Sequence, residues 1–86
     1  MKITEVEIKP IKPKKGLVAF ASIVIENNLY LGSIGVHTKL NSQGYRITYP
    51  NKKLGSNYID IYHPINKQIG LKIEKAITKK AEKILG

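Results

Sequence analysis

The sequence changes its periodicity once, between Tyr62 and Asn66, and this change constrains the fold more than any other feature. Residues 57–62, NYIDIY, alternate like a β-strand, and Pro64 has no N–H to donate, so strand pairing must end at His63. From Asn66 onward the apolar residues recur at helical spacing, at Ile69, Ile73, Ala76, Ile77, Ala81 and Ile84. Asn66 is a suitable N-cap, because its side chain can accept from the first free N–H groups. The sequence therefore predicts one C-terminal helix directly after a strand.

Upstream of this corner the sequence predicts a series of short strands. They span residues 2–9, 17–26, 29–38, 45–50 and 57–62. The segment 17–26 is apolar on both faces and rich in β-branched residues, so it is expected to be a central strand. Asn27 and Asn28 tolerate left-handed geometry and predict a tight hairpin turn, and residues 41–44, NSQG, predict the next turn.

Two lysine-bearing segments are predicted to lie outside the sheet. PIKPKKG (10–16) contains two prolines and is expected to be an exposed basic connection, because proline cannot pair in a central strand. NKKLGSN (51–57) is expected to be a polar loop. The predicted fold is α+β, with an antiparallel sheet of four to five strands followed by one C-terminal helix. It forms a single domain over residues 1–86.

Composition limits the chemistry that the chain can perform. There is no cysteine, which excludes disulfides, thiolate nucleophiles and zinc ribbons and fits a reducing compartment. The N-terminal residues lack the apolar core of a signal peptide, and no apolar run approaches the length of a membrane span. We therefore expect a cytoplasmic protein that does not enter the membrane.

His63 is the first candidate for a chemical role, but the sequence does not supply the further residues that metal binding or nucleophilic catalysis needs. His37 and His63 are too few to form a metal site, and no serine is placed in a nucleophile motif. His63 is expected to hydrogen-bond at the strand exit and to help set the helix direction. Gly32 and Gly35 lie in a strand with no lysine after them, so they predict a bulge or a close-packed neighbour rather than a phosphate loop. We expect no catalytic site, no metal, no cofactor and no small-molecule substrate.

Charge is the strongest functional signal that the residues themselves provide. Fifteen basic residues against six acidic ones give a formal charge of +9, a positive field that attracts polyanions. The lysines form three groups, namely Lys9, Lys12, Lys14 and Lys15, then Lys52 and Lys53, and then the outer face of the helix. Such dispersed charge suits phosphate contacts, although a solvated surface remains the alternative.

Two other functions for these segments are less favoured. Tyr45 and Tyr49 could stack on unpaired bases, but strand tyrosines are more commonly half-buried. The basic amphipathic helix could lie on an anionic membrane. Its apolar stripe lacks Trp and Phe, however, and the open sheet needs that stripe as a cover.

Several blocks of the chain resemble the stage V sporulation protein G (SpoVG) septation-protein family. That family has a strand ending in a basic turn after proline, then a polar loop, then an Asp-Ile-x-His-Pro-Ile-Asn block leading into a helix. The matching segments here are Pro50–Lys53, Asp60–Ile61 and His63–Asn66. Residues 3–6 and 19–23 also resemble the first two strands of the family, so the resemblance covers nearly the whole chain.

The resemblance implies a small α+β homodimer that acts as a cytoplasmic bacterial regulator. Members of the family influence asymmetric septation during sporulation and bind DNA or RNA. The resemblance also implies that His63 is a structural residue at the corner between the strand and the helix. The expected nucleic-acid-binding residues are Asn51, Lys52, Lys53, Lys67 and Lys72. The alternative is a protein-interaction module of the septation machinery whose charge is incidental.

The chain also departs from the family pattern at particular positions. Arg46 and Thr48 stand where the family usually has apolar residues, so the outer face of their strand differs. Gly70 stands early in the helix, where the family often carries arginine. If that arginine holds nucleic acid, Lys67 or Lys72 must take its place.

Overall fold

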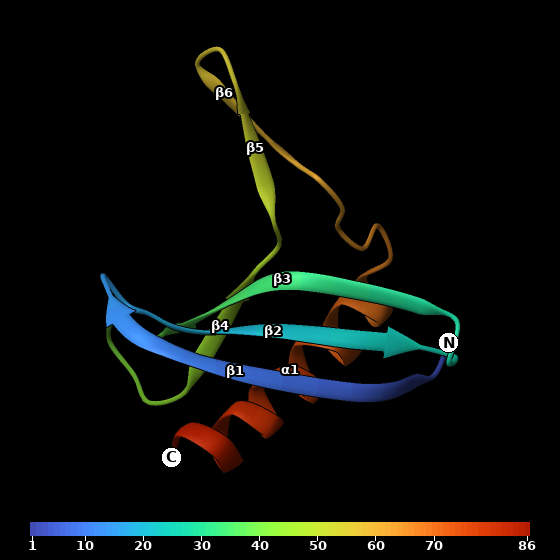
Figure 1. The fold of residues 1–86 in the computed structure, drawn as a ribbon, viewed down its shortest axis with the longest axis horizontal. Coiled ribbons are helices and arrows are strands. Elements are labelled where there is room, and N and C mark those ends of the chain that lie inside the picture. Colours follow the sequence, from blue (N-terminus) through green and yellow to red (C-terminus); the bar gives the residue numbers. More distant parts are fainter.

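A computed structural model describes residues 1–86, which form six strands and one helix. The elements are β1 (Ile3–Lys14), β2 (Leu17–Ile25), β3 (Leu29–Thr38), β4 (Tyr45–Thr48), β5 (Asn51–Leu54), β6 (Asn57–Asp60) and α1 (Lys67–Leu85). The first four strands form an antiparallel meander in the order β1-β2-β3-β4, and β5 pairs with β6 in a separate two-stranded sheet (Figure 1). The predicted α+β class and its four-stranded antiparallel sheet are confirmed.

The core lies between one face of the main sheet and α1. Alternate residues of β2 point to the helix because strand side chains alternate between faces. The buried apolar residues are Ile8, Ala19, Ala21, Ile23, Ile25, Ile34, Val36, Ile73, Ile77 and Ala81. The position of β2 between β1 and β3 confirms the prediction of a central strand.

The opposite face of the main sheet has no layer over it, and Figure 1 looks onto this face with α1 behind. Phe20, which alternates with the buried residues of β2, is 42% exposed, and Tyr30 of β3 is 68% exposed. Aromatic surface of the central strands is therefore left exposed on this face. We call this surface the open sheet face.

The two glycines of β3, Gly32 and Gly35, fulfil the two predicted roles, which are a bulge and a close-packed neighbour. The pairing of β2 with β3 shifts between Ala21 and Ile23, and Ser33 opposite this shift has a φ of 60°, which marks a bulge at Gly32–Ser33. At Gly35, a Cβ atom would lie 2.6 Å from the Thr48 hydroxyl of β4. Only glycine lets the two strands approach this closely.

The prediction that residues 10–16 are a connection outside the sheet is wrong for most of the segment. β1 continues to Lys14, with Pro10 opposite Ala19 and an irregularity between Pro10 and Lys14. β1 is an edge strand, so a missing N–H on its outer side breaks no pairing. The turn itself is confined to Lys15 and Gly16, both with positive φ.

The prediction that residues 51–57 are a polar loop is also wrong. Asn51–Leu54 form β5, and they pair with Asn57–Asp60 around a turn at Gly55 and Ser56. The hairpin projects away from the body of the molecule (Figure 1). We call residues 51–60, which make up this hairpin, the arm.

The helix begins where the sequence predicts. Asn66 is the N-cap, and its side chain accepts hydrogen bonds from the N–H groups of Gln68 and Ile69 at 2.8 and 3.2 Å. At the other end the apolar stripe differs from the prediction, because Ile84 is exposed while Leu85 packs on the core. The residues of α1 that pack on the core recur every four positions, at Ile69, Ile73, Ile77, Ala81 and Leu85, so the line of contact turns slowly around the helix axis and reaches Leu85 instead of Ile84 in the last turn.

Candidate nucleic-acid interface

The arm has two chemically different faces, because directly paired residues of an antiparallel ladder share a side. Lys53 pairs with Tyr58, and its amine lies 6.0 Å from the centre of the tyrosine ring. Asn51 and Asp60 form the next pair on this polar face. The other face carries the pairs Lys52–Ile59 and Leu54–Asn57, and its aliphatic side chains point into solvent.

All ten arm residues are exposed, so the arm holds its lysines well away from the body. The predicted residues Asn51, Lys52 and Lys53 are adjacent in sequence, but they do not form one surface. Asn51 and Lys53 lie on the polar face, and Lys52 lies on the opposite one. Sequence reasoning placed all three in a loop and could not separate them.

A pair of tyrosines joins the arm to the body. The Tyr62 hydroxyl donates to the Gly32 carbonyl oxygen at 2.7 Å, and the Tyr62 ring meets Tyr49 edge to face with ring centres 5.8 Å apart. Burial raises the pKa of Tyr62 to about 12, with neighbouring Tyr49 and Tyr30 adding to the effect. Burial, followed by the charge of Glu74, also raises the pKa of Tyr49. The expectation that Tyr45 and Tyr49 are half-buried is confirmed, because both pack against the core.

His63 lies at the exit of the arm, with its Nδ1 atom 3.3 Å from Asp60 Oδ2. This contact closes the bend between β6 and the helix start, which is where the sequence predicted a hydrogen bond. Half of each side chain is exposed, so the pair lies on the surface of the corner.

Lys67 and Lys72 lie in the first half of α1, away from the hairpin tip. Lys67 lines an open hollow of about 400 Å³ beside Pro64 and Gly70. A Cβ atom at Gly70 would lie 3.4 Å from the Pro64 ring, so glycine here lets the corner sit close against the helix. The Lys72 amine donates to the Met1 carbonyl oxygen, and its side chain is therefore directed toward the N-terminus.

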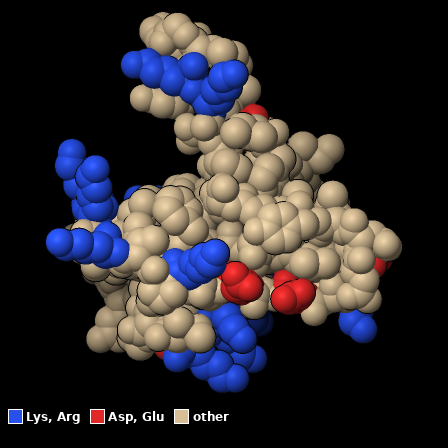
Figure 2. Space-filling view, in the orientation of Figure 1, with Lys and Arg blue, Asp and Glu red and all other residues tan.

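The basic side chains are dispersed over the molecule and free of carboxylate partners. Figure 2 shows them on the arm, at the far end of the sheet and along the lower edge, with wide uncharged areas between. No lysine or arginine lies within 4.0 Å of an Asp or Glu oxygen; the only contact of this kind belongs to His63. Their charge is available to an external anion.

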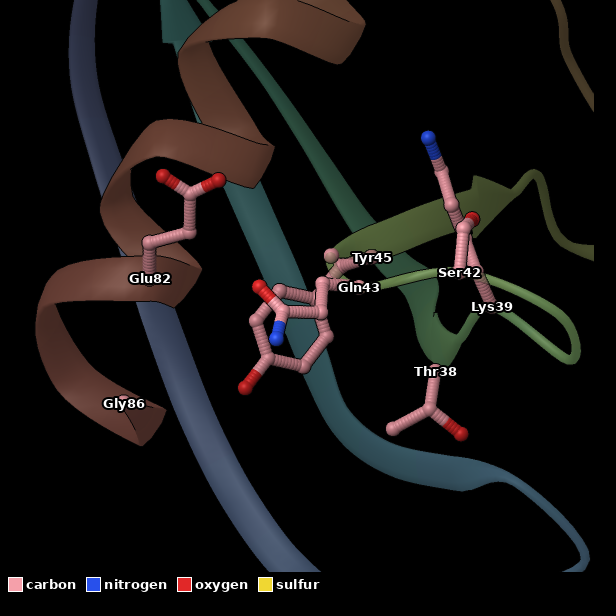
Figure 3. Close-up of a pocket in the computed structure, with 8 residues that line it drawn as sticks. Thr38, Lys39, Ser42, Gln43, Tyr45, Glu82 and Gly86 are labelled. Atoms are coloured by element: carbon pink, nitrogen blue, oxygen red, sulfur yellow. The ribbon is translucent and has the colours of Figure 1, made fainter.

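The most spacious hollow is polar and lies between the turn at 39–44 and the last turn of α1 (Figure 3). It measures about 680 Å³, and Tyr45 is its one hydrophobic lining residue. Glu82 comes from the helix, while Lys39 and Ser42 lie on the far side of the turn from it (Figure 3). No histidine lines the hollow, and Ser42 makes no side-chain hydrogen bond with Glu82 or Lys39.

Two further observations describe the remaining surface chemistry. No group of three or more His, Asp or Glu side chains gathers where it could hold a metal ion. The single helix is not apolar enough to cross a membrane.

Comparison of the sequence with known proteins places the chain in a family. The SpoVG family model matches residues 1–83. A SpoVG septation protein of Clostridium kluyveri is 34% identical over 85 residues, covering 98% of this chain and 86% of the relative. The SpoVG septation protein of Onion yellows phytoplasma is 33% identical over 86 residues, covering 99% of this chain and 85% of the relative. That of Clostridium perfringens is 34% identical over 85 residues, covering 98% of this chain and 92% of the relative. The chain belongs to the SpoVG family, as its basic turn and His-Pro-Ile-Asn corner predicted.

Proposed function

We propose that this protein is a non-enzymatic, nucleic-acid-binding regulator of the bacterial cytoplasm, associated with septation or sporulation. The septation role comes from the names of the relatives, all of them bacterial. The binding role is supported by one observation above all, which is the set of dispersed cations without a carboxylate partner, two of them on the exposed arm. Phosphates favour dispersed positive charge, and each neutralised phosphate releases counterions.

In this proposal the polar face of the arm contacts the nucleic acid directly. Lys53 meets a phosphate, and Asn51, two residues earlier on the same face, hydrogen-bonds the backbone or a base edge. Lys52 adds charge from the other face, and Lys67 and Lys72 add separate positive charges from the first half of α1. Whether the ligand is DNA or RNA depends on groove shape and on the 2′-hydroxyl, so both are ligands to test.

A salt titration of binding tests the proposal. The purified protein is titrated into labelled duplex DNA, and in parallel into RNA of the same sequence, at several salt concentrations. Several phosphate contacts give a log–log slope of about −0.9 per contact on duplex DNA. Failure of both nucleic acids to bind at low salt would overturn the proposal.

The second candidate function is a protein-interaction module of the septation machinery. The specific observation in its favour is apolar surface, because the arm exposes aliphatic side chains that no part of its own body covers. An interface of this kind depends only weakly on salt, so the slope of the same titration separates the two functions. A flat slope with a protein partner, and no binding to nucleic acid, would favour the module.

A further inference from the structure

The open sheet face carries an exposed aromatic ring with an empty position beside it. Phe20 of β2 pairs with Lys9 of β1 on one side and with Gly35 of β3 on the other, and directly paired residues share a face of the sheet. Because glycine has no side chain, it places nothing beside the ring, and 42% of Phe20 is exposed although it lies in a central strand. The ring is accessible to a flat ligand.

A second exposed aromatic ring, that of Tyr30, lies on the same face. Tyr30 pairs with Val24, which alternates with the buried residues Ile23 and Ile25 and so points away from the helix. A Cβ atom at Gly32 would lie 2.8 Å from the Tyr30 ring, so glycine lets this ring pack against the backbone of the bulge. The ring is held by this contact on one side, while 68% of the residue remains exposed.

Phe20 and Tyr30 border the same hollow, which measures about 250 Å³. Hydrogen-bonding side chains also line it, namely Glu7, Lys9, Ser22 and Ser33. Proteins hold unpaired nucleobases with this combination, because aromatic side chains stack on the faces of a base and polar groups hydrogen-bond its edge. Tyr45 and Tyr49, which the sequence also offered for stacking, pack against the core instead.

Basic side chains extend from this hollow toward the turn between β1 and β2. Lys14, Leu17, His37 and Arg46 pair in succession across the four strands. A Cβ atom at Gly35 would lie 3.0 Å from His37 Nε2 and 3.4 Å from Leu17 Cδ1, so this row lies on the open sheet face. Lys14 and Arg46 are exposed, and neither has a carboxylate oxygen within 4.0 Å. Both cations are placed to contact phosphates.

The charges on this face follow an order along β1. Glu5 and Glu7 come first, Lys9 lies beside the hollow, and Lys14 lies at the far end. A phosphate chain is repelled by the carboxylates and attracted by the cations. A base in the hollow would therefore be joined to a backbone that runs toward Lys14 and Arg46. Figure 2, which views this face, shows acidic and basic side chains next to one another on it.

We propose that the open sheet face binds single-stranded nucleic acid, with one unpaired base held between Phe20 and Tyr30. The phosphates on either side of this base meet Lys9, Lys14 and Arg46. A duplex hides the faces of its bases within the stack, so this site takes only unpaired bases. The inference rests on the proposed function for its class of ligand, but it uses a different surface from the arm, whose phosphate contacts need no exposed base.

Fluorescence anisotropy with labelled oligo(dC) and with a labelled duplex tests the site, and the readout is the ratio of the two affinities. Phe20→Leu and Tyr30→Leu keep apolar bulk but remove a ring, and each should weaken binding of the single strand about ten-fold or more while sparing the duplex. Phe20→Tyr keeps the ring and should retain the wild-type ratio. Tyr58→Leu is the matched control and should leave the ratio unchanged, because Tyr58 is 68% exposed, like Tyr30, but lies on the arm. Circular dichroism checks that each variant is folded.

A fluorescent reporter locates the base. The chain has no tryptophan, so Phe20→Trp introduces a single one. Oligo(dC) should quench its fluorescence by stacking on it, whereas a duplex at the same phosphate concentration should not. Leu71→Trp, at an exposed position of the helix, is the control and should respond to neither.

The Glu7 carboxylate adds a test of base recognition. It can accept from the amino group of cytosine, whereas thymine presents a carbonyl oxygen at that position. The wild type should therefore bind oligo(dC) more tightly than oligo(dT). Glu7→Gln offers a donor as well as an acceptor, so it should reduce this preference without weakening binding of the duplex. A preference that survives the change would remove Glu7 from the site.

Three results would overturn this inference and leave the proposed function standing. They are unchanged single-strand affinity in both Phe20→Leu and Tyr30→Leu, equal losses of single-strand and duplex affinity in these variants, and quenching of the Phe20→Trp reporter by the duplex as strongly as by the single strand. A wild type that binds neither single strands nor duplexes would overturn both proposals.

Discussion

The body and the arm of this protein are stabilised by different interactions. All ten buried apolar residues belong to β1, β2, β3 and α1, and the arm contributes none. The body is held by burial, which is not directional and tolerates changes of surface charge. The arm is held by backbone pairing and by its joint with the body, and its charged residues are therefore free to change. Stability is concentrated in the body, whereas three of the residues proposed to contact nucleic acid, Asn51, Lys52 and Lys53, lie on the arm.

The largest expected effect is a loss of unfolding free energy when a buried side chain of the body is shortened. Ile77 is fully buried between α1 and the sheet, and Ile77→Ala should lower the free energy of unfolding by about 3 kcal/mol, through lost transfer energy and the cavity left behind. Ile59→Ala removes the same atoms from the exposed arm and should cost well under half as much. Urea denaturation at a fixed protein concentration measures both. Equal losses would show that the arm is part of the same core.

The second prediction concerns the joint between the two regions. Tyr62→Phe removes the hydroxyl that donates to the half-buried Gly32 carbonyl, and loss of this hydrogen bond should cost about 1 kcal/mol of unfolding free energy. Tyr58→Phe is the matched control, because its ring lies on the exposed arm next to Lys53. No difference in denaturation midpoint between the two variants would show that the hydroxyl does not fasten the arm.

These two regions also differ in how far the sequence predicts them. The body follows its apolar pattern, because burial selects the alternation of β2 and the helical stripe from Ile69 onward, and the side chain of Asn66 sets the helix start. Residues 10–14 were misassigned because proline excludes only a central strand, and sequence alone does not reveal which strand will be at the edge.

Of the two strands of the arm, the sequence predicts β6, which lies within the expected strand 57–62, but not β5, whose residues are all exposed. Asn51, Lys52 and Lys53 show no alternation of polarity, and their pairing partners lie five to nine residues further along the chain. The one local signal is Gly55–Ser56, a two-residue hairpin turn in which Gly55 adopts a φ of 64°. The basic turn and the corner were found by their resemblance to the family, whereas the opposite orientations of Lys52 and Lys53 required the pairing register.

The third prediction concerns recognition by the arm and leaves the body intact. Lys53→Ala should flatten the dependence of log affinity on log salt for duplex DNA by about 0.9 units, because one phosphate contact is lost. Lys79→Ala, which removes the same charge from the far half of the helix, is the matched control. Fluorescence anisotropy across a salt series gives both slopes. A larger change for the helix variant, with both proteins folded, would remove the arm from the centre of the site.

The smallest expected effect is a pH dependence that belongs to the body alone. The Nε2 atom of His37 lies 2.9 Å from the Thr48 hydroxyl, and burial, followed by the charge of Arg46, lowers the pKa of His37 below its ordinary value. The unfolded chain then binds a proton at a higher pH than the folded chain does. The stability due to His37 is therefore complete above the unfolded pKa of about 6.5 and falls as the pH is lowered through the folded pKa.

The dependence should be shallow, because the ring lies on the open sheet face and is only partly covered. Denaturation midpoints between pH 7.5 and about 5 should show it in the wild type and lose it in His37→Gln. Arg46→Gln, which removes the second cause but leaves the ring covered, should retain most of it. If Arg46→Gln abolishes the dependence, charge and not burial controls His37.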